Sequence, residues 1–348
     1  MTPVIVTFQP EGTRIEAQPG DSILRELRRA VTPLQVLRLR THFSCLWGLA
    51  AKLRHHNWKV TATIHLRDVD APTIRNIEGG DASKQNYGVA IDVGTTTIVA
   101  QLIDLSTGAI VGMEASQNRQ VHYGEDVISR MIFACGHGGL ASLTEAVGAS
   151  INSLVDGLVR EAGVAHHDVT CLVAAGNTTM THLLLGLDPR HIRIEPYIST
   201  ANRFPRFQAA ELGLHAHPKA ILHCLPCVSS YVGGDITAGV LACGMSDHPQ
   251  VSALIDVGTN GEIVIGNREW LVCCSCSAGP AFEGGGVKCG MRAMRGAIEK
   301  VRINGRKVIY WTVGNARPRG ICGSGLVDAV AELVAEQIID QNGSLSQG

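Results

Sequence analysis

The amino-acid sequence predicts an α/β protein made of two similar halves, preceded by a small α+β segment. Three observations support this prediction. Apolar residues make up 45% of the 348-residue chain and charged residues only 18%, so a sizeable core can form. Segments with strand character alternate with segments of helical periodicity. The motif Ile-Asp-Val-Gly-Thr occurs twice, which predicts a duplicated subdomain.

Composition and charge exclude several classes of protein. The formal net charge is −1, so nothing indicates nucleic acid or an anionic membrane surface as a partner. The chain has no uncharged apolar stretch of the length that spans a bilayer, and residues 1–10 lack the pattern of a signal peptide. Eleven cysteines at scattered spacing fit no disulfide framework. We therefore expect a cytoplasmic protein with reduced thiols, no membrane partner and no nucleic-acid partner.

Residues 1–85 predict the small leading segment. The expected elements are strands at 3–8 and 13–17, a helix from Asp21 or Ser22 to Arg29, a helix at 34–55 and a strand at 58–66. Residues 67–86 are polar and rich in turn formers, so the main boundary is placed there.

From residue 87 the pattern changes to a meander of three strands followed by helices. The first expected strand contains residues 89–91 and leads into Asp92-Val93-Gly94, and further strands follow at 97–102 and from 110. Helices are expected at 125–135 and 141–162, a strand at 171–175, helices at 178–187 and 233–242, a second meander from 253 and a last helix at 326–339.

The repeated motif has the chemistry of a phosphate-binding hairpin. In the first copy, a buried strand delivers Asp92, which can hold Mg²⁺ through water. Gly94 allows a tight turn and a close approach to a phosphate. Thr95, Thr96 and Thr97 then offer hydroxyls and consecutive backbone N–H groups, which form an anion-binding concavity. The equivalent residues of the second copy are Asp256, Gly258, Thr259, Asn260 and Gly261.

One such hairpin is equally well explained as an ordinary β-turn, whereas two matched copies favour nucleotide binding. The chain contains no Gly-x-x-x-x-Gly-Lys-Ser/Thr loop, so the site is not a Walker loop. It also has no Gly-x-Gly-x-x-Gly after a strand, which argues against a Rossmann dinucleotide site.

The duplicated hairpins resemble the phosphate motifs of the acetate/sugar kinase, Hsp70 and actin superfamily. Within it, five segments resemble the ATPase part of the reductive activators of corrinoid proteins. These segments are 87–97, 123–130, 175–182, 277–284 and 320–325. The resemblance covers the chain from about residue 86 onward, and it implies two ribonuclease-H-like (actin-like ATPase) subdomains of which the second is incomplete.

The resemblance also implies a function. Such activators use ATP and Mg²⁺ to assist the reduction of Co(II) to Co(I) in a corrinoid (cobalamin) protein of a methyltransferase system, and a homodimer is one expected assembly. Asp92 and Asp256 would organise Mg²⁺, and Asp235 would orient the attacking water. Gly279 and Glu283 would contact the nucleotide. Asp235 as a helix cap and Glu283 as a solvated acid are the structural alternatives.

The family's ferredoxin-like domain carries a [2Fe-2S] cluster on four cysteines, but residues 1–85 contain only Cys45. We therefore expect no iron–sulfur cluster, an internal deletion, a C-terminal truncation and impaired activity. The expected segments are 1–32, a partial ferredoxin-like β-grasp; 33–85, a middle-domain remnant and linker; 86–252, the first ATPase subdomain; and 253–348, the incomplete second one.

Two other functions stay open at this point. The first is a small-molecule kinase of the same superfamily, with Asp235 as the base. The second is a non-catalytic remnant. The cysteines of Cys224-Leu-Pro-Cys227 and Cys273-Cys274-Ser-Cys276 are interpreted as buried thiols, and the pairs His55-His56 and His166-His167 as surface residues.

Overall fold

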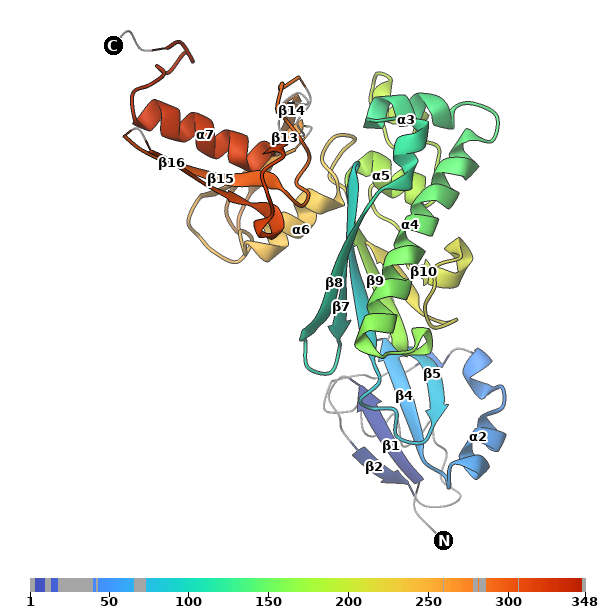
Figure 1. Cartoon of the computed structure of the whole chain (residues 1–348). Helices are drawn as coiled ribbons and strands as arrows, with labels where there is room; N and C mark the ends of the chain where they lie inside the picture. The colour runs from blue at the N-terminus through green and yellow to red at the C-terminus, as the bar shows by residue number, and fades with distance from the viewer. Residues whose placement is uncertain are drawn as a thin grey trace. The chain divides into compact units, whose positions relative to one another are not determined.

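The structure of the chain is a computed structural model, and it divides into two compact units, Met1–Ala238 and Gly239–Gly348 (Figure 1). It describes residues 4–9, 14–17, 40–41, 43–65, 73–258, 260–277, 281, 286–305 and 307–345. Among the helices in these ranges, none combines the length and apolarity needed to cross a bilayer. The division between the units lies inside helix α6 (Gly234–Ala242), upstream of the boundary expected after residue 252.

The first unit begins with a five-stranded mixed sheet. Its order is β2 (Arg14–Ala17), β1 (Val4–Gln9), β4 (Val60–His65), β5 (Thr73–Gly79) and β3 (Arg40–Thr41). Strand β1 pairs in parallel with β4, so strands from the expected segments 1–32 and 33–85 share one sheet. The 3-10 turn η2 (Phe43–Leu46) and helix α2 (Leu49–His55) lie between β3 and β4 in the chain.

Two expectations for this region are wrong. Within the described part of the helix expected at 34–55, only α2 is α-helical, because Arg40–Thr41 pairs with β5 and Gly48 adopts a left-handed conformation just before Leu49. Residues 67–86, which were expected to be turn-rich, contain strand β5. Its Ile74 and Ile77 are buried although polar residues surround them in the sequence. The helix expected from Asp21 or Ser22 lies outside the described residues.

A six-stranded sheet forms the centre of the first unit. Its order is β10 (Phe207–Gln208), β11 (Ile221–Cys224), β9 (Val169–Ala175), β6 (Tyr87–Val93), β7 (Thr97–Asp104) and β8 (Ile110–Gln117). Strands β11, β9 and β6 are parallel, whereas β6, β7 and β8 form the expected antiparallel meander. The expected helices are confirmed as α3 (Val127–Ala134), α4 (Gly139–Ala162) and α5 (Thr178–Leu184). Four 3-10 turns accompany them: η3 (Arg119–Tyr123) precedes α3, η4 (His166–Asp168) lies between α4 and β9, and η5 (Arg190–Arg193) and η6 (Ala209–Leu212) follow α5.

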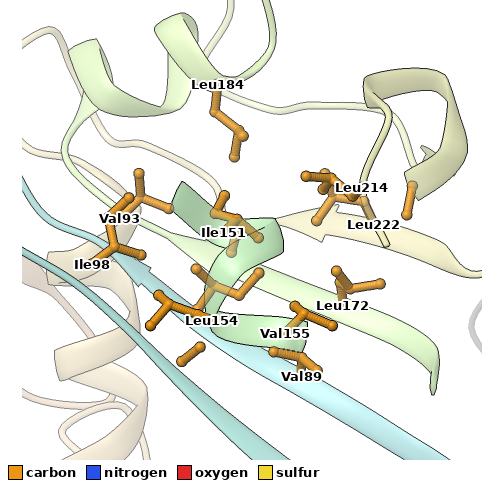
Figure 2. Close-up of a cluster of buried hydrophobic side chains, with 14 of the residues drawn as sticks. Val89, Val93, Ile98, Ile151, Leu154, Val155, Leu172, Leu184, Leu214 and Leu222 are labelled. Atoms are coloured by element: carbon orange, nitrogen blue, oxygen red, sulfur yellow. The ribbon is translucent and has the colours of Figure 1, made fainter. Parts of the chain in front are cut away.

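Helix α4 supplies one side of the core of this unit. Its buried apolar residues recur every three or four positions, so they form one face of the helix. That face packs against side chains from β6, β7, β9 and β11, as Figure 2 shows. The labelled contributors are Val89, Val93, Ile98, Ile151, Leu154, Val155, Leu172, Leu184, Leu214 and Leu222. Each fully buried aliphatic side chain of this size contributes about 1.5–3 kcal/mol.

The second unit contains two three-stranded sheets. One is the expected second meander, β12 (Ser252–Val257), β13 (Asn260–Gly266) and β14 (Leu271–Ser277). The other has the order β16 (Lys307–Thr312), β15 (Ala297–Asn304) and β17 (Gly320–Ile321). Helix α7 (Gly323–Ala335) confirms the expected last helix, and its Glu332 carboxylate accepts a hydrogen bond from the Ile303 backbone N–H at 2.7 Å.

Replacing Ile151 by Ala should destabilise the first unit by about 2–5 kcal/mol, because this side chain is fully buried between α4 and the sheet. Hydrogen exchange of peptides from β6 and β9 measures the loss. The control Ile110→Ala changes a side chain that is 62% exposed, so it should change the free energy of unfolding by no more than about 0.5 kcal/mol. Equal losses in the two variants would contradict the assigned core.

Candidate functional site

The first phosphate hairpin lies at the end of β6. Asp92 is the penultimate residue of this strand, and its side chain is exposed while Val93 beside it is buried. A Cβ on Gly94 would lie only 2.3 Å from the carbonyl oxygen of Thr97, so the turn can be this tight only with glycine. Thr95 and Thr96 form the turn and Thr97 begins β7.

Two asparagines hold the hairpin in place, and neither was selected by the sequence analysis. Asn118 Nδ2 donates to the Gly94 carbonyl at 2.9 Å, and its backbone N–H donates to the Thr96 carbonyl at 2.9 Å. Asn177 Nδ2 donates to Thr95 Oγ1 at 3.1 Å, while its Oδ1 caps helix α5 by accepting from the Met180 N–H. The position of Asn177, directly between a strand and a helix, is the sequence signal that indicates such a cap.

Three turns meet at this end of the sheet through direct main-chain contact. A Cβ on Gly176 would lie 2.7 Å from the Val93 carbonyl oxygen. A Cβ on Gly233 would lie 2.3 Å from Asn177 Cα, and the Gly234 N–H donates to the Gly176 carbonyl at 2.8 Å. The hairpin, the β9–α5 turn and the start of α6 therefore form one cluster.

Asp235 belongs to this cluster. It lies in the first turn of α6, and its Oδ1 accepts a hydrogen bond from the Ile236 N–H at 2.8 Å. Its backbone N–H lies 3.4 Å from the Gly176 carbonyl oxygen. A carboxylate is stabilised in the first turn of a helix. The location of Asp235 therefore fits both a helix cap and a residue that acts beside a phosphate.

The segment 123–130 contributes a buried cation, the Arg130 guanidinium, next to the residues that hold the first hairpin. Arg130 is fully buried; its Nε donates to the Gly124 carbonyl at 2.9 Å and its Nη1 to Gln120 Oε1 at 3.3 Å. Gln120 Nε2 in turn donates to the Leu143 carbonyl at 2.9 Å. Arg130 thus joins α3 to the segment that carries Asn118.

The second hairpin differs from the first in two ways. Among the described residues, the closest neighbour of a Cβ on Gly258 would be the Asn260 carbonyl oxygen at 3.8 Å, which is an ordinary van der Waals contact, so these residues leave room for a side chain at this turn. Asp256 lies directly across the β12–β13 ladder from Glu262. Burial, together with the neighbouring Asp256 carboxylate, raises the pKa of Glu262 although Ser275 donates a hydrogen bond to it.

The remaining residues of the second hairpin follow the expected order. Asn260 begins β13, and Gly261 is paired with Val257. Thr259, Gly279 and Glu283 lie outside the described residues. The pairing of Asp256 with Glu262 was missed because only the β13 register shows it; an acid two residues after Asn260 is the signal available in the sequence.

The cysteines separate into buried and exposed groups. Cys45 is 4% exposed, and its thiol donates to the Arg75 carbonyl at 3.1 Å, so it is a core residue and not a cluster ligand. Burial raises the pKa of Cys224 to about 12 and also raises that of Cys227. The interpretation of Cys274 and Cys276 as buried thiols is wrong, because β14 is an edge strand and exposes both side chains.

The histidine pairs lie near the surface as expected. His55, His56 and His167 are exposed, whereas His166 is half-buried against Asp156.

The residues of the first hairpin fit the phosphates of a nucleotide with Mg²⁺. Gly94 lets the main chain come close to a phosphate, and the threonines place hydroxyls beside the turn. Asp92 supplies an exposed carboxylate of the kind that binds Mg²⁺ through its waters. Residues 1–85 do not fit a [2Fe-2S] cluster in the same way. The cluster needs four thiolates, and their single cysteine, Cys45, is buried beside the first sheet with its thiol hydrogen-bonded.

Gly94→Ala should destabilise the first unit by about 1–3 kcal/mol, because the added methyl group meets the Thr97 carbonyl oxygen. The matched change in the second hairpin, Gly258→Ala, should cost no more than about 0.5 kcal/mol since its Cβ has room. Hydrogen exchange of β6–β7 and β12–β13 peptides measures both. A larger loss in the second hairpin would contradict the difference between the turns.

In the folded protein at pH 8, iodoacetamide should modify Cys274 and Cys276 and spare Cys224 and Cys227. Alkylation requires the thiolate, and the raised pKa values keep the two buried groups as thiols until the pH approaches about 12 for Cys224. Mass spectrometry of peptides gives the extent at each cysteine, and unfolding in urea should make all of them react. Rapid modification of Cys224 in the native protein would show that it is accessible.

Comparison with known proteins assigns both units. The model described as the RACo middle region matches residues 87–248, and the model described as the C-terminal domain of RACo, the ASKHA domain, matches residues 250–348. The chain is 44% identical to a solved structure, a reductive activator for a corrinoid, iron–sulfur protein, with a TM-score of 0.83 over 94% of this chain and 52% of that one. The expected actin-like α/β fold is thereby confirmed.

Two curated relatives support the same assignment. The corrinoid activation enzyme RamQ of Eubacterium limosum is 35% identical over 274 residues, which are 78% of this chain and 46% of the relative. The [Co(II) methylated amine-specific corrinoid protein] reductase of Methanosarcina barkeri is 26% identical over 239 residues, 65% of this chain and 42% of the relative. The chain thus spans about half the length of these proteins. It belongs to the family of RACo, the reductive activators of corrinoid proteins.

Proposed function

We propose that the chain binds ATP with Mg²⁺ through its two hairpins and thereby supports the reduction of Co(II) to Co(I) in a corrinoid protein. The observation that carries this proposal is the first hairpin, closed at Gly94 and fixed by Asn118 and Asn177. The names of the relatives support a corrinoid protein as the acceptor.

Each residue of the first unit has a separate task in this proposal. Thr95, Thr96 and Thr97 would hold the phosphates, and Asp92 would help to hold Mg²⁺. Asp235 would orient the attacking water and accept its proton, while the water oxygen bonds to the γ-phosphorus and the bond to the bridging oxygen breaks, which releases ADP. In the second unit, Asp256, Gly258, Thr259, Asn260 and Gly261 contact phosphate and Mg²⁺, and Gly279 and Glu283 contact the nucleoside.

Residues 1–85 do not supply the electron in this proposal. Residues 1–85 offer a single thiol, Cys45, which is buried and hydrogen-bonded. One electron from a low-potential donor converts Co(II) to Co(I), and nucleotide binding supplies free energy by favouring one conformation of the activator. The acceptor we propose is the corrinoid protein of a methyltransferase system in the cytoplasm, where ATP is available.

Mg²⁺-ATP at about 100 times its Kd should stabilise the protein by about 2.7 kcal/mol in a thermal-shift assay. Asp92→Asn should weaken Mg²⁺-dependent ATP binding about tenfold or more, because a charge-assisted interaction is lost. Asp104→Asn, at the opposite end of the same β6–β7 pair, is the matched control and should bind normally. Asp235→Asn should retain binding and lose about 10²–10⁴-fold in hydrolysis.

Phosphate release is then measured with and without a corrinoid protein and a chemical reductant, while Co(I) is followed by its absorption. Stimulation of both signals by the corrinoid protein supports the proposal. Transfer of the γ-phosphoryl group to a small hydroxyl compound would indicate the kinase alternative instead. Absence of any nucleotide-induced thermal shift would indicate the non-catalytic alternative.

A further inference from the structure

Three side chains that come from separate segments meet at one carboxylate oxygen in the first unit. His166 Nε2 lies 2.7 Å from Asp156 Oδ1, and His215 Nδ1 lies 2.8 Å from the same oxygen. Asp156 belongs to α4, His166 begins η4, and His215 lies in the loop after η6. The three donor atoms all lie within 4.8 Å of one another.

We propose that Asp156, His166 and His215 form a binding site for a divalent transition-metal ion, of which Zn²⁺ fits best. Two imidazole nitrogens and one carboxylate oxygen are a ligand set for Zn²⁺ with one position left for water. Mg²⁺ prefers oxygen ligands only, so the site should discriminate against the ion that accompanies ATP. The inference does not depend on nucleotide binding.

The geometry needs only a small adjustment to accept the ion. Ligands at about 2.0–2.2 Å from tetrahedral Zn²⁺ lie about 3.3–3.5 Å from one another. The present contacts of 2.7 and 2.8 Å must therefore open by about half an ångström or slightly more. The side chains are 41%, 44% and 51% exposed for Asp156, His166 and His215, so they can move without disturbing the core.

The side chains also suit an incoming cation chemically. Asp156 Oδ1 faces one ring nitrogen of each histidine, so the three donor atoms already point toward one another. A neutral imidazole needs only to shift its proton to the other ring nitrogen for the nitrogen facing Asp156 to bind the ion.

The backbone that carries the ligands is already fixed. Asn152 lies one helical turn before Asp156; its Oδ1 accepts from the His215 N–H at 2.8 Å and its Nδ2 donates to the Gly213 carbonyl at 2.9 Å. Asp168 Oδ2 accepts from the Ala165 N–H at 3.1 Å and so holds the turn that carries His166. Such supporting hydrogen bonds orient metal ligands and strengthen binding.

A second group, Glu78, His167 and His217, has similar spacing but different chemistry. His217 Nδ1 accepts a hydrogen bond from the Lys219 N–H at 2.9 Å, and its Nε2 lies 3.1 Å from Asn76 Nδ2, so both ring nitrogens already have partners. Burial and the nearby charges of His167, Lys219 and Lys52 lower the pKa of His217 to about 4, and these charges also oppose a metal cation.

Within the first unit, the proposed site lies away from the first phosphate hairpin. His166 precedes the first residue of β9, whereas Asp92 pairs with Ala175 at the last residue of the same strand. A seven-residue strand separates the two ends by about 20 Å. The ion would therefore join α4, η4 and the loop after η6 as a structural cross-link.

The test is zinc titration of the whole chain after iodoacetamide has blocked accessible thiols, since exposed cysteines would otherwise compete. The exposed thiols among the described residues are Cys135, Cys243, Cys274, Cys276 and Cys289. Calorimetry should show one equivalent of Zn²⁺ bound, with a rise in Tm that Mg²⁺ does not produce. Asn152→Ala should weaken Zn²⁺ binding about 10–100-fold, and His166→Gln or His215→Gln at least as much.

His167→Gln and His137→Gln are the controls and should bind Zn²⁺ like the unmodified chain. Co²⁺ provides a second measurement that needs no variant: its visible absorption should appear without the near-ultraviolet band of thiolate ligation. Equal Zn²⁺ binding by the chain and by the His166→Gln/His215→Gln double variant would overturn the proposal. So would loss of binding in His167→Gln alone, which would assign the ion to the second group.

Discussion

The close main-chain contact among three turns is the constraint on which the rest of the first unit depends. A Cβ on Gly176 or Gly233 would overlap a backbone atom of a neighbouring turn, and a Cβ on Gly94 would overlap the Thr97 carbonyl oxygen within the first hairpin itself. These contacts bring the ends of β6 and β9 against the start of α6, and they place main-chain N–H groups and the carboxylates of Asp92 and Asp235 in one region. The six-stranded sheet and α4 serve to hold these turns in position, because the buried strands that lead to them cannot shift register without exposing their apolar face.

The duplicated hairpins have diverged in their physical character although their sequences match closely. The first is closed by contact at Gly94 and fixed by two asparagine side chains. The second has space around Gly258 and instead places two acids, Asp256 and Glu262, across one ladder. Two adjacent carboxylates repel each other, and this repulsion adds to burial in raising the pKa of Glu262.

Much of the fold could be predicted from the sequence, because hydrophobic periodicity and glycine turns report local structure directly. The meanders after residues 87 and 253 and the helices α3, α4 and α7 have clear patterns and were predicted. Strand β5 was not, since its burial depends on pairing with β4 and not on its own composition. Asp92, Gly94 and Asp235 could be selected as candidates because they stand in short local motifs. Asn118 and Glu262 could not be selected in this way. Their roles arise from partners that only the folded chain brings near.

Arg130 has a consequence for how this part of the protein opens. A guanidinium stays charged at every pH that the protein meets, so it cannot escape the cost of burial by losing its proton. Its acceptors, the Gly124 carbonyl and Gln120 Oε1, are in place only while the segment before α3 is folded. The segment from Asn118 to Arg130 therefore cannot fray residue by residue. We expect it to open as a single cooperative unit, and the hairpin that Asn118 holds to open together with it.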